Sequence, residues 1–341
     1  MYEAFYGFRE RPFDLTPNPR FLLLTGKHRE ALSNLQYGLT SRRGLTLLIG
    51  DAGTGKTTLI RAVIQDYEKQ GAVIAYLNNP TLSRPEFYEF LTQAFDLSAR
   101  AAASKAALLS ELSQVLDRRH AAGLMTGLVI DEAQAMPDEL LEEVRLLANI
   151  ETTTDKLLPI VLAGQPELAD RLNQVSLRQL KQRVALRCLL LALDAKETAE
   201  YIAGRIRVAG GNSVMVFTRQ AVDSIYDRSG GIPRLISVIC DNALISGFAA
   251  DRRPVGRDIV EDVCRDFDLG SKAPTIAPAK AAVSAARRQL QAVPAPPAPV
   301  PAPPAPAARP AAEAAAPAQK PQTFARSLFE HFSIKRRFSI F

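Results

Sequence analysis

Short apolar runs alternate with longer amphipathic stretches along much of the chain. Four runs have the length and composition of buried strands, at 45–50, 72–78, 127–132 and 158–164. Each is followed by a loop and a helical pattern. The expected helices between these runs are roughly 57–70, 84–96, 105–121 and 138–149. Near-continuous apolar strands that alternate with helices are typical of a parallel sheet covered on both faces. The pattern therefore predicts an α/β domain over residues 1–194.

Beyond residue 195 the strand pattern stops and helical periodicity continues. The expected helices are 195–209, 218–228, 233–248 and 256–267, separated by glycine-rich turn signals. This predicts a small all-α lid domain over 195–269. Residues 273–322 are then mostly Ala and Pro. Such a composition cannot build an apolar core, so we expect a disordered linker over 270–323 and a separate terminal segment over 324–341.

Charge is distributed unevenly. The chain has 341 residues, 47% hydrophobic and 23% charged, with a formal net charge of +6. Residues 271–341 contain ten Lys or Arg and two acidic residues, so the positive excess belongs to the tail. A basic pI is therefore no evidence that the folded part binds nucleic acid, which requires clustered Lys and Arg. Three cysteines without CxxC spacing favour a reducing compartment. We also expect neither a signal peptide nor a membrane span, and thus a cytoplasmic protein.

The sequence GDAGTGKT at 50–57 matches the P-loop (Walker A) motif and lies between an expected strand and an expected helix. Its glycines allow backbone N–H groups to turn onto phosphates at a helix N-terminus. Lys56 is placed to reach the β- and γ-phosphates, and the hydroxyl of Thr57 is suited to Mg²⁺. The motif predicts an ATP and Mg²⁺ site whose nucleotide-binding residues are Gly50, Asp51, Ala52, Gly53, Thr54, Gly55, Lys56, Thr57 and Thr58.

A second acidic motif, LVIDEAQ at 128–134, places Asp131 and Glu132 at the end of an apolar strand. Ligands of open α/β sheets bind at the carboxyl ends of strands. We therefore expect Asp131 to hold Mg²⁺ through water, together with Thr57, and Glu132 to orient and polarise the attacking water. The alternative is that the acidic pair caps a helix or faces solvent in a turn.

Further polar residues could complete the site. Gln165 ends the run at 158–164 and could contact the γ-phosphate, or simply begin a helix with Pro166. Arg234 lies in the first turn of a helix, an unfavourable place for a cation unless it faces an anion, so it is expected to contact the nucleotide. Arg178, Arg183 and Arg187 lie just before the expected helical domain, and Arg183 is the preferred candidate of the three for a functional role.

Six motifs in order resemble the A-type ATPases of the general (type II) secretion pathway, which belong to the AAA+ class. The resemblance covers roughly residues 1–268 and rests on FYGFRERPFDLTPNPRFLLLTGKHREAL, GDAGTGKT, LVIDEAQ, VLAGQPEL, LRQLKQR and GGIPRLISVICDNAL. It implies a five-stranded parallel sheet with the P-loop strand central. It also implies sensor roles for Gln165 and Arg234, a trans-acting finger at Arg183, and an N-terminal segment, 1–43, that covers the adenine, with His28 and Arg29 near the following helix. Phe5, Phe8 and Phe13 of this segment could equally pack in a core.

The resemblance further implies an oligomeric ATPase that serves a secretion, exosortase or polysaccharide-export system from the cytoplasmic side, peripheral to the inner membrane. Secretion-pathway members typically continue into a transmembrane helix and a peptidoglycan-binding domain. We expect this chain to have neither, and thus no direct role in opening the cell wall. Two alternatives are a transposition-helper ATPase that assembles on DNA, and a regulatory protein that binds ATP without hydrolysing it.

The terminal segment carries Phe324, Leu328, Phe329 and Phe332 at helical spacing, followed by the basic run 335–337. An apolar face beside basic residues is typical of an interfacial helix on an anionic membrane or of a docking peptide. We expect this segment to bind a membrane surface or an envelope protein. The alternatives are that it folds back onto the ATPase or remains disordered.

Overall fold

The computed structural model describes residues 1–16, 19–21, 25–42 and 44–269. The expected linker at 270–323 and docking segment at 324–341 lie outside the described residues. None of the helices in the described ranges combines the length and apolar composition that a bilayer crossing requires.

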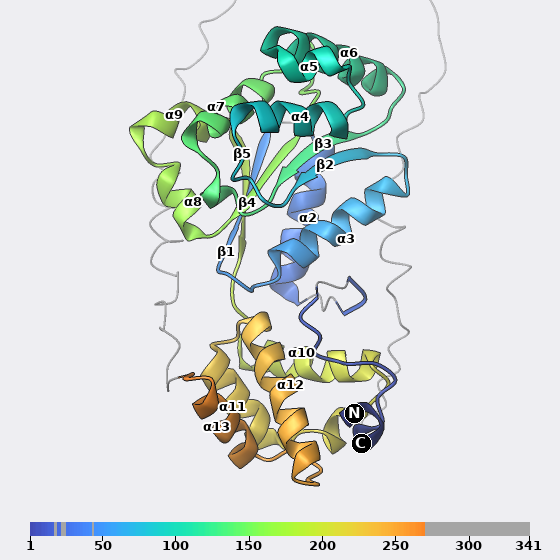
Figure 1. Ribbon diagram of the computed structural model, residues 1–341, viewed down its shortest axis with the longest axis vertical. Helices are drawn as coiled ribbons and strands as arrows, with labels where there is room; N and C mark the ends of the chain where they lie inside the picture. Colours follow the sequence, from blue (N-terminus) through green and yellow to red (C-terminus); the bar gives the residue numbers. More distant parts are fainter. Residues whose placement is uncertain (17–18, 22–24, 43, 270–341) are drawn as a thin grey trace, which may run out of the picture. The chain divides into compact units, whose positions relative to one another are not determined.

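Five parallel strands form one sheet, as the family resemblance implied (Figure 1). They are β1 (Leu45–Gly50), β2 (Val73–Leu77), β3 (Thr126–Ile130), β4 (Ile160–Gly164) and β5 (Val184–Leu190). Their order is β2-β3-β4-β1-β5, so β4 lies directly beside β1. The expectation that β1 is central is wrong, because β4 takes the middle place and only β5 lies beyond β1.

The apolar pattern of the sequence did not predict strand β5, because β5 lies at the edge of the sheet and lacks a continuous apolar run. Its inward positions include Cys188 and Leu190, which are buried, while the alternating positions Ala185, Arg187 and Leu189 are exposed. An edge strand with one solvated face shows this two-residue alternation instead of a continuous apolar run.

Two separate cores cover the faces of the sheet. Leu48 of β1 packs with apolar residues of α2 and α3, whereas Leu47 and Ile49 belong to the core shared with α4, α6 and α7. The helices of this part are α2 (Gly26–Thr40), α3 (Lys56–Glu68), α4 (Arg84–Ala94), α5 (Ala99–Ala103), α6 (Lys105–Ala121), α7 (Asp138–Leu147), α8 (Pro166–Arg171) and α9 (Arg178–Lys181). Successive side chains of a strand point to opposite faces of the sheet, so each strand contributes apolar side chains to both cores.

The remaining helices are α10 (Ala195–Val208), α11 (Arg219–Ser229), α12 (Pro233–Ala249) and α13 (Arg257–Asp266). Their bounds agree with the sequence-based prediction to within one residue. Local signals explain this accuracy: Asp194 and Glu197 form a capping box at the start of α10, and Gly230 ends α11 in the left-handed conformation.

The first residues of the chain pack with these helices. The short helix α1 (Tyr2–Tyr6), dark blue in Figure 1, lies beside α12. Tyr6, Phe8 and Phe13 are buried in the core formed by α10 to α13. Phe8 and Phe13 therefore serve as core residues, one of the two roles open to them from the sequence. The N-terminal segment, grouped with the α/β domain from the sequence, is anchored in the helical part.

Helix α2 approaches strand β1 closely at Gly38. A Cβ atom added at Gly38 of α2 would lie 2.1 Å from the hydroxyl oxygen of buried Thr46. We expect Gly38→Ala to lower the free energy of unfolding by about 1–3 kcal/mol through overpacking, although Ala favours a helix over Gly by about 1 kcal/mol. Urea denaturation measures this change.

Gly26, in the same helix, is the matched control, because a Cβ added there meets no atom within 4 Å. Gly26→Ala should leave stability unchanged or raise it. Equal stability of the Gly38 and Gly26 variants would contradict the close helix–strand approach.

Candidate nucleotide-binding site

The loop between β1 and α3 has the backbone conformation that its glycines permit. Gly53 and Gly55 have φ angles of 80° and 101°, values that favour glycine. Gly55 immediately precedes α3, so the N-terminus of this helix faces the loop. Thr54 is fully buried, and its hydroxyl donates to the carbonyl of Asp51 at 2.9 Å. The loop is thus held in a single shape around an anion-binding helix terminus.

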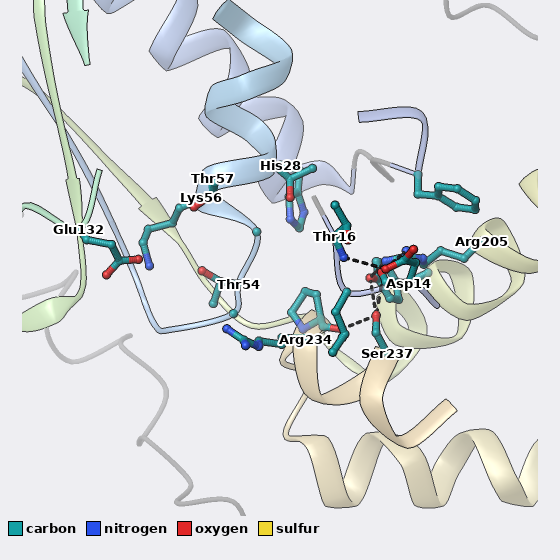
Figure 2. Close-up of a pocket in the computed structure, with 17 residues that line it drawn as sticks. Asp14, Thr16, His28, Thr54, Lys56, Thr57, Glu132, Arg205, Arg234 and Ser237 are labelled. Atoms are coloured by element: carbon teal, nitrogen blue, oxygen red, sulfur yellow. Dashed lines mark hydrogen bonds between the residues drawn. The ribbon is translucent and has the colours of Figure 1, made fainter. Parts of the chain in front are cut away.

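Lys56 is buried and points into this loop. Its Nζ donates to the carbonyl oxygens of Gly50 at 2.7 Å and Asp51 at 3.1 Å. Burial lowers the pKa of the Lys56 ammonium, while the carboxylates of Glu132 and Asp131 oppose that shift. Figure 2 shows the Lys56 and Glu132 side chains directed toward one another. A mobile cation thus lies where phosphate oxygens would approach the helix N-terminus.

Asp131 and Thr57 meet as the sequence predicted. The Thr57 hydroxyl donates to Oδ2 of Asp131 at 2.6 Å, and the Tyr76 hydroxyl donates to the same oxygen at 3.2 Å. Burial raises the pKa of Tyr76 to about 12, and Asp131 adds to this effect. The sequence analysis did not single out Tyr76, because a tyrosine in an apolar strand gives no signal of this contact.

The donor set at this point fits Mg²⁺. A hydroxyl and a carboxylate provide hard oxygen ligands, and Mg²⁺ in nucleotide sites takes its other ligands from phosphates and water. In the described part of the chain no group of three or more His, Cys, Asp or Glu could hold a metal. Thr57 and Asp131 supply two oxygen donors, which fit an ion that would arrive with a nucleotide.

Glu132 follows Asp131 in a left-handed conformation, with φ 51°. Its Oε2 accepts hydrogen bonds from the side-chain amide of Gln134 at 2.6 Å and from that of Gln165 at 3.3 Å. Gln165 lies between β4 and α8, so the adjacent strands bring it to Glu132. The sequence predicted a role for Gln165 but missed Gln134.

The first turn of α12 contacts the P-loop. The backbone N–H of Arg234 donates to the carbonyl of Gly53 at 3.2 Å, and a Cβ added at Gly53 would lie 2.7 Å from the Cβ of Arg234. The helical part therefore brings Arg234 to the nucleotide site, where its side chain faces the loop near Thr54 (Figure 2).

These elements enclose a cavity of about 400 Å³, a volume within the usual range for small-molecule sites. One end is formed by residues 53–58, Glu132 and Arg234. Gly50 and Asp51 support this end through their bonds to Lys56, and Ala52 is exposed at the turn of the loop. The rest of the lining comprises Asp14, Leu15, Thr16, Phe21, His28, Tyr201, Arg205, Pro233 and Ser237.

His28 connects α2 with the P-loop. It is buried, its Nδ1 lies 2.9 Å from the Thr25 hydroxyl, and burial lowers the pKa of its imidazole. A hydrogen bond with the backbone of Thr54 opposes that shift. His28 therefore lies in the cavity wall. Arg29 is exposed, and it is absent from that wall.

Arg205 of α10 fixes the N-terminal segment at the far end of the cavity (Figure 2). Its guanidinium donates to the carbonyls of Pro12 at 2.6 Å and Asp14 at 3.1 Å, and to the Tyr201 hydroxyl at 2.6 Å. It also lies 5.0 Å from the ring centroid of Phe21. Sequence reasoning missed Arg205, since the carbonyls of Pro12 and Asp14 that it binds lie almost 200 positions earlier.

Three arginines proposed from the sequence lie outside the cavity. Arg178 begins α9, Arg183 lies in the turn before β5, and Arg187 is on β5. All three side chains are exposed, and none of them lines the cavity. They are therefore not part of the nucleotide site of their own chain.

Comparisons with known proteins agree with this geometry. Residues 39–172 match the model of the AAA domain. The chain is 41% identical over 249 residues to General secretion pathway protein A of Aeromonas hydrophila, a match that covers 73% of this chain and 45% of that protein. The chain therefore spans less than half the length of this relative.

Solved structures show the same fold at low sequence identity. The Aeropyrum pernix ORC2 protein, in its ADPNP-ADP complexes, has a TM-score of 0.57 and 18% identity, with 76% of this chain and 72% of that chain covered. Drosophila ORC bound to DNA has a TM-score of 0.53 and 18% identity, with 81% and 68% covered.

The P-loop, the acidic strand end and the helical part define a nucleotide-binding protein of the AAA+ class. The chain belongs, within that class, to the family of General secretion pathway protein A.

The anchoring role of Arg205 can be tested by stability. Arg205→Met keeps an apolar stem but leaves the Pro12 and Asp14 carbonyls without their donor. Since hydrogen bonds to charged groups contribute about 1.5–3 kcal/mol, we expect the free energy of unfolding to fall by about 2–4 kcal/mol in chemical denaturation.

The control is Arg207→Met on the same helix, where the side chain is exposed. That variant should stay within about 0.5 kcal/mol of the unaltered protein. A similar small effect at Arg205 would show that these bonds do not hold the N-terminal segment.

Proposed function

We propose that this protein binds ATP with Mg²⁺ and hydrolyses it to ADP and phosphate. The observation that carries the proposal is the convergence of Lys56, the Thr57–Asp131 pair and Glu132 at one end of a cavity of about 400 Å³. A cation, an oxygen donor pair and a carboxylate are the groups that phosphoryl transfer requires.

Each side chain has a distinct task in this proposal. Lys56 would exchange its two loop carbonyls for phosphate oxygens, so its charge stabilises the triphosphate and the transition state. Glu132 would orient the water that attacks the γ-phosphorus while the bond to ADP breaks. Mg²⁺ held near Thr57 and Asp131 would compensate charge on the phosphates. Gln165, which contacts Glu132, and Arg234, which lines the cavity, would contact the γ-phosphate.

The other end of the cavity would hold the base. Leu15, Phe21 and Tyr201 offer apolar and aromatic surface there, and Arg205 fixes the backbone carbonyls of residues 12 and 14. Residues from both the N-terminal segment and α10 would therefore cover the adenine, which links nucleotide binding to the position of the helical part.

We further propose that the protein acts as an oligomeric motor or switch for a secretion or envelope system, on the cytoplasmic side of the inner membrane. The similarity to General secretion pathway protein A supports this role. Exposed Arg183 supports assembly, because a finger must reach a neighbouring subunit. The likeness to ORC proteins, at 18% identity, is one of fold and gives the DNA-assembly alternative no further support.

Two substitutions separate binding from hydrolysis. Lys56→Ala should weaken ATP binding strongly, measured by calorimetry, because the triphosphate loses a buried cation. Glu132→Gln should bind ATP and Mg²⁺ as the unaltered protein does but hydrolyse ATP at least about 100-fold more slowly. Unchanged ATP affinity in the first variant would refute the site, and unchanged turnover in the second would refute the role of Glu132.

The role of Arg183 across a subunit interface has its own test. Arg183→Ala should abolish ATP hydrolysis without weakening ATP binding, since an arginine finger contributes about 10³–10⁵ in rate. Mixing this variant with Glu132→Gln should restore part of the turnover, because some interfaces then pair an intact Glu132 with an intact Arg183. Arg187→Ala, on the neighbouring exposed strand, is the matched comparison. Stable mixed oligomers without any recovery would exclude the trans role of Arg183.

A further inference from the structure

Gln134 lies behind the carboxylate of Glu132, outside the cavity wall. A single 3₁₀ turn, Ala133–Ala135, directly follows Glu132, and the N–H of Ala135 donates to the Glu132 carbonyl at 2.9 Å. This turn brings the Gln134 side chain back toward the residue two positions earlier. The amide Nε2 of Gln134 then lies 2.6 Å from Oε2 of Glu132.

The other end of the same amide is held by the neighbouring strand. Its Oε1 accepts the backbone N–H of Gln165 at 3.1 Å, directly after β4. Because a backbone N–H can only donate, it fixes the oxygen of the amide toward β4 and the NH₂ group toward Glu132. The orientation of Gln134 is therefore determined by the sheet, independently of Glu132.

The backbone of Gln134 is fixed as well. Nη1 of Arg171, the last residue of α8, donates to the Gln134 carbonyl at 2.6 Å, and Arg171 also pairs with Asp138 at the start of α7. A side chain fixed at its carbonyl, its amide oxygen and its amide nitrogen has little rotational freedom. Through these contacts Gln134 fixes the position of the Glu132 carboxylate relative to β4 and α8.

Both amide donors use one oxygen of Glu132. Gln134 and Gln165 each donate to Oε2, and within the described part of the chain no hydrogen bond reaches Oε1. Glu132 itself lines the cavity. We infer that Gln134 is the positioning residue for ATP hydrolysis, which clamps Oε2 of Glu132 so that Oε1 is presented to the attacking water.

This inference rests on the proposed ATPase function and deepens it. A group that acts only through Glu132 should affect the rate of the chemical step and leave nucleotide binding intact. Loss of an outer partner of a catalytic group typically costs about 10- to 100-fold in activity. Gln134→Ala should therefore lower kcat by about 10- to 100-fold, with the KM for ATP and the ATP affinity within about twofold of the unaltered protein.

Gln134→Ala also removes the acceptor for the Gln165 N–H, so a second variant separates the two contacts. Gln134→Glu keeps an acceptor oxygen toward Gln165 but places a carboxylate beside Glu132. Two carboxylates at that distance repel one another, so Glu132 loses its donor to Oε2 while the contact with Gln165 is kept. Gln134→Glu should therefore lower kcat as Gln134→Ala does, with ATP affinity again retained.

The experiment measures steady-state ATP hydrolysis by the full chain, together with calorimetric ATP binding and thermal denaturation. Gln114→Ala is the control, an exposed glutamine in α6. The inference is wrong if Gln134→Ala retains full kcat, if its loss follows weaker ATP binding or lower stability, or if Gln134→Glu retains full kcat. Absence of hydrolysis by the unaltered protein would overturn the proposed function and this inference together. Normal hydrolysis that depends on Glu132 but not on Gln134 would overturn the inference alone.

Discussion

The parallel direction of all five strands is the constraint on which the site depends. Parallel strands end at one edge of a sheet, so residues far apart in the chain gather there without any direct sequence relation. β1 leads into the P-loop, β3 into Asp131 and Glu132, and β4 into Gln165. The hydrogen bonds from Thr57 to Asp131 and from Gln165 to Glu132 then join these strand ends.

The helical part supplies the remaining residues of the site at this edge of the sheet. The first turn of α12 touches Gly53, and Arg205 of α10 holds the carbonyls of Pro12 and Asp14. The cavity therefore exists only when these two parts meet. A ligand bound there would contact the P-loop, the N-terminal segment and α12 at once, so its binding energy would act on their relative position.

Polar side chains connect Glu132 to the neighbouring strand and helices. Gln134 and Gln165 both contact its Oε2, and Arg171 joins the Gln134 carbonyl to Asp138. Arg171 ends α8, and the chain then runs through α9 to the turn that carries Arg183. These hydrogen bonds connect the Glu132 carboxylate to the end of α8 and the start of α7.

The sequence by itself determined the parts whose signals are local. The P-loop motif, the acidic strand end and the four helices after residue 195 were predicted because apolar periodicity, glycines and capping residues act within a few positions. Only the tertiary structure decided the partners that depend on distant contacts. β5 was hidden by the alternation of an edge strand, the middle place of β4 follows from strand pairing, and Phe8 and Phe13 pack in the helical core. Tyr76, Gln134 and Arg205 carry no motif of their own, because their hydrogen bonds form only after the strands and the two parts of the fold have come together.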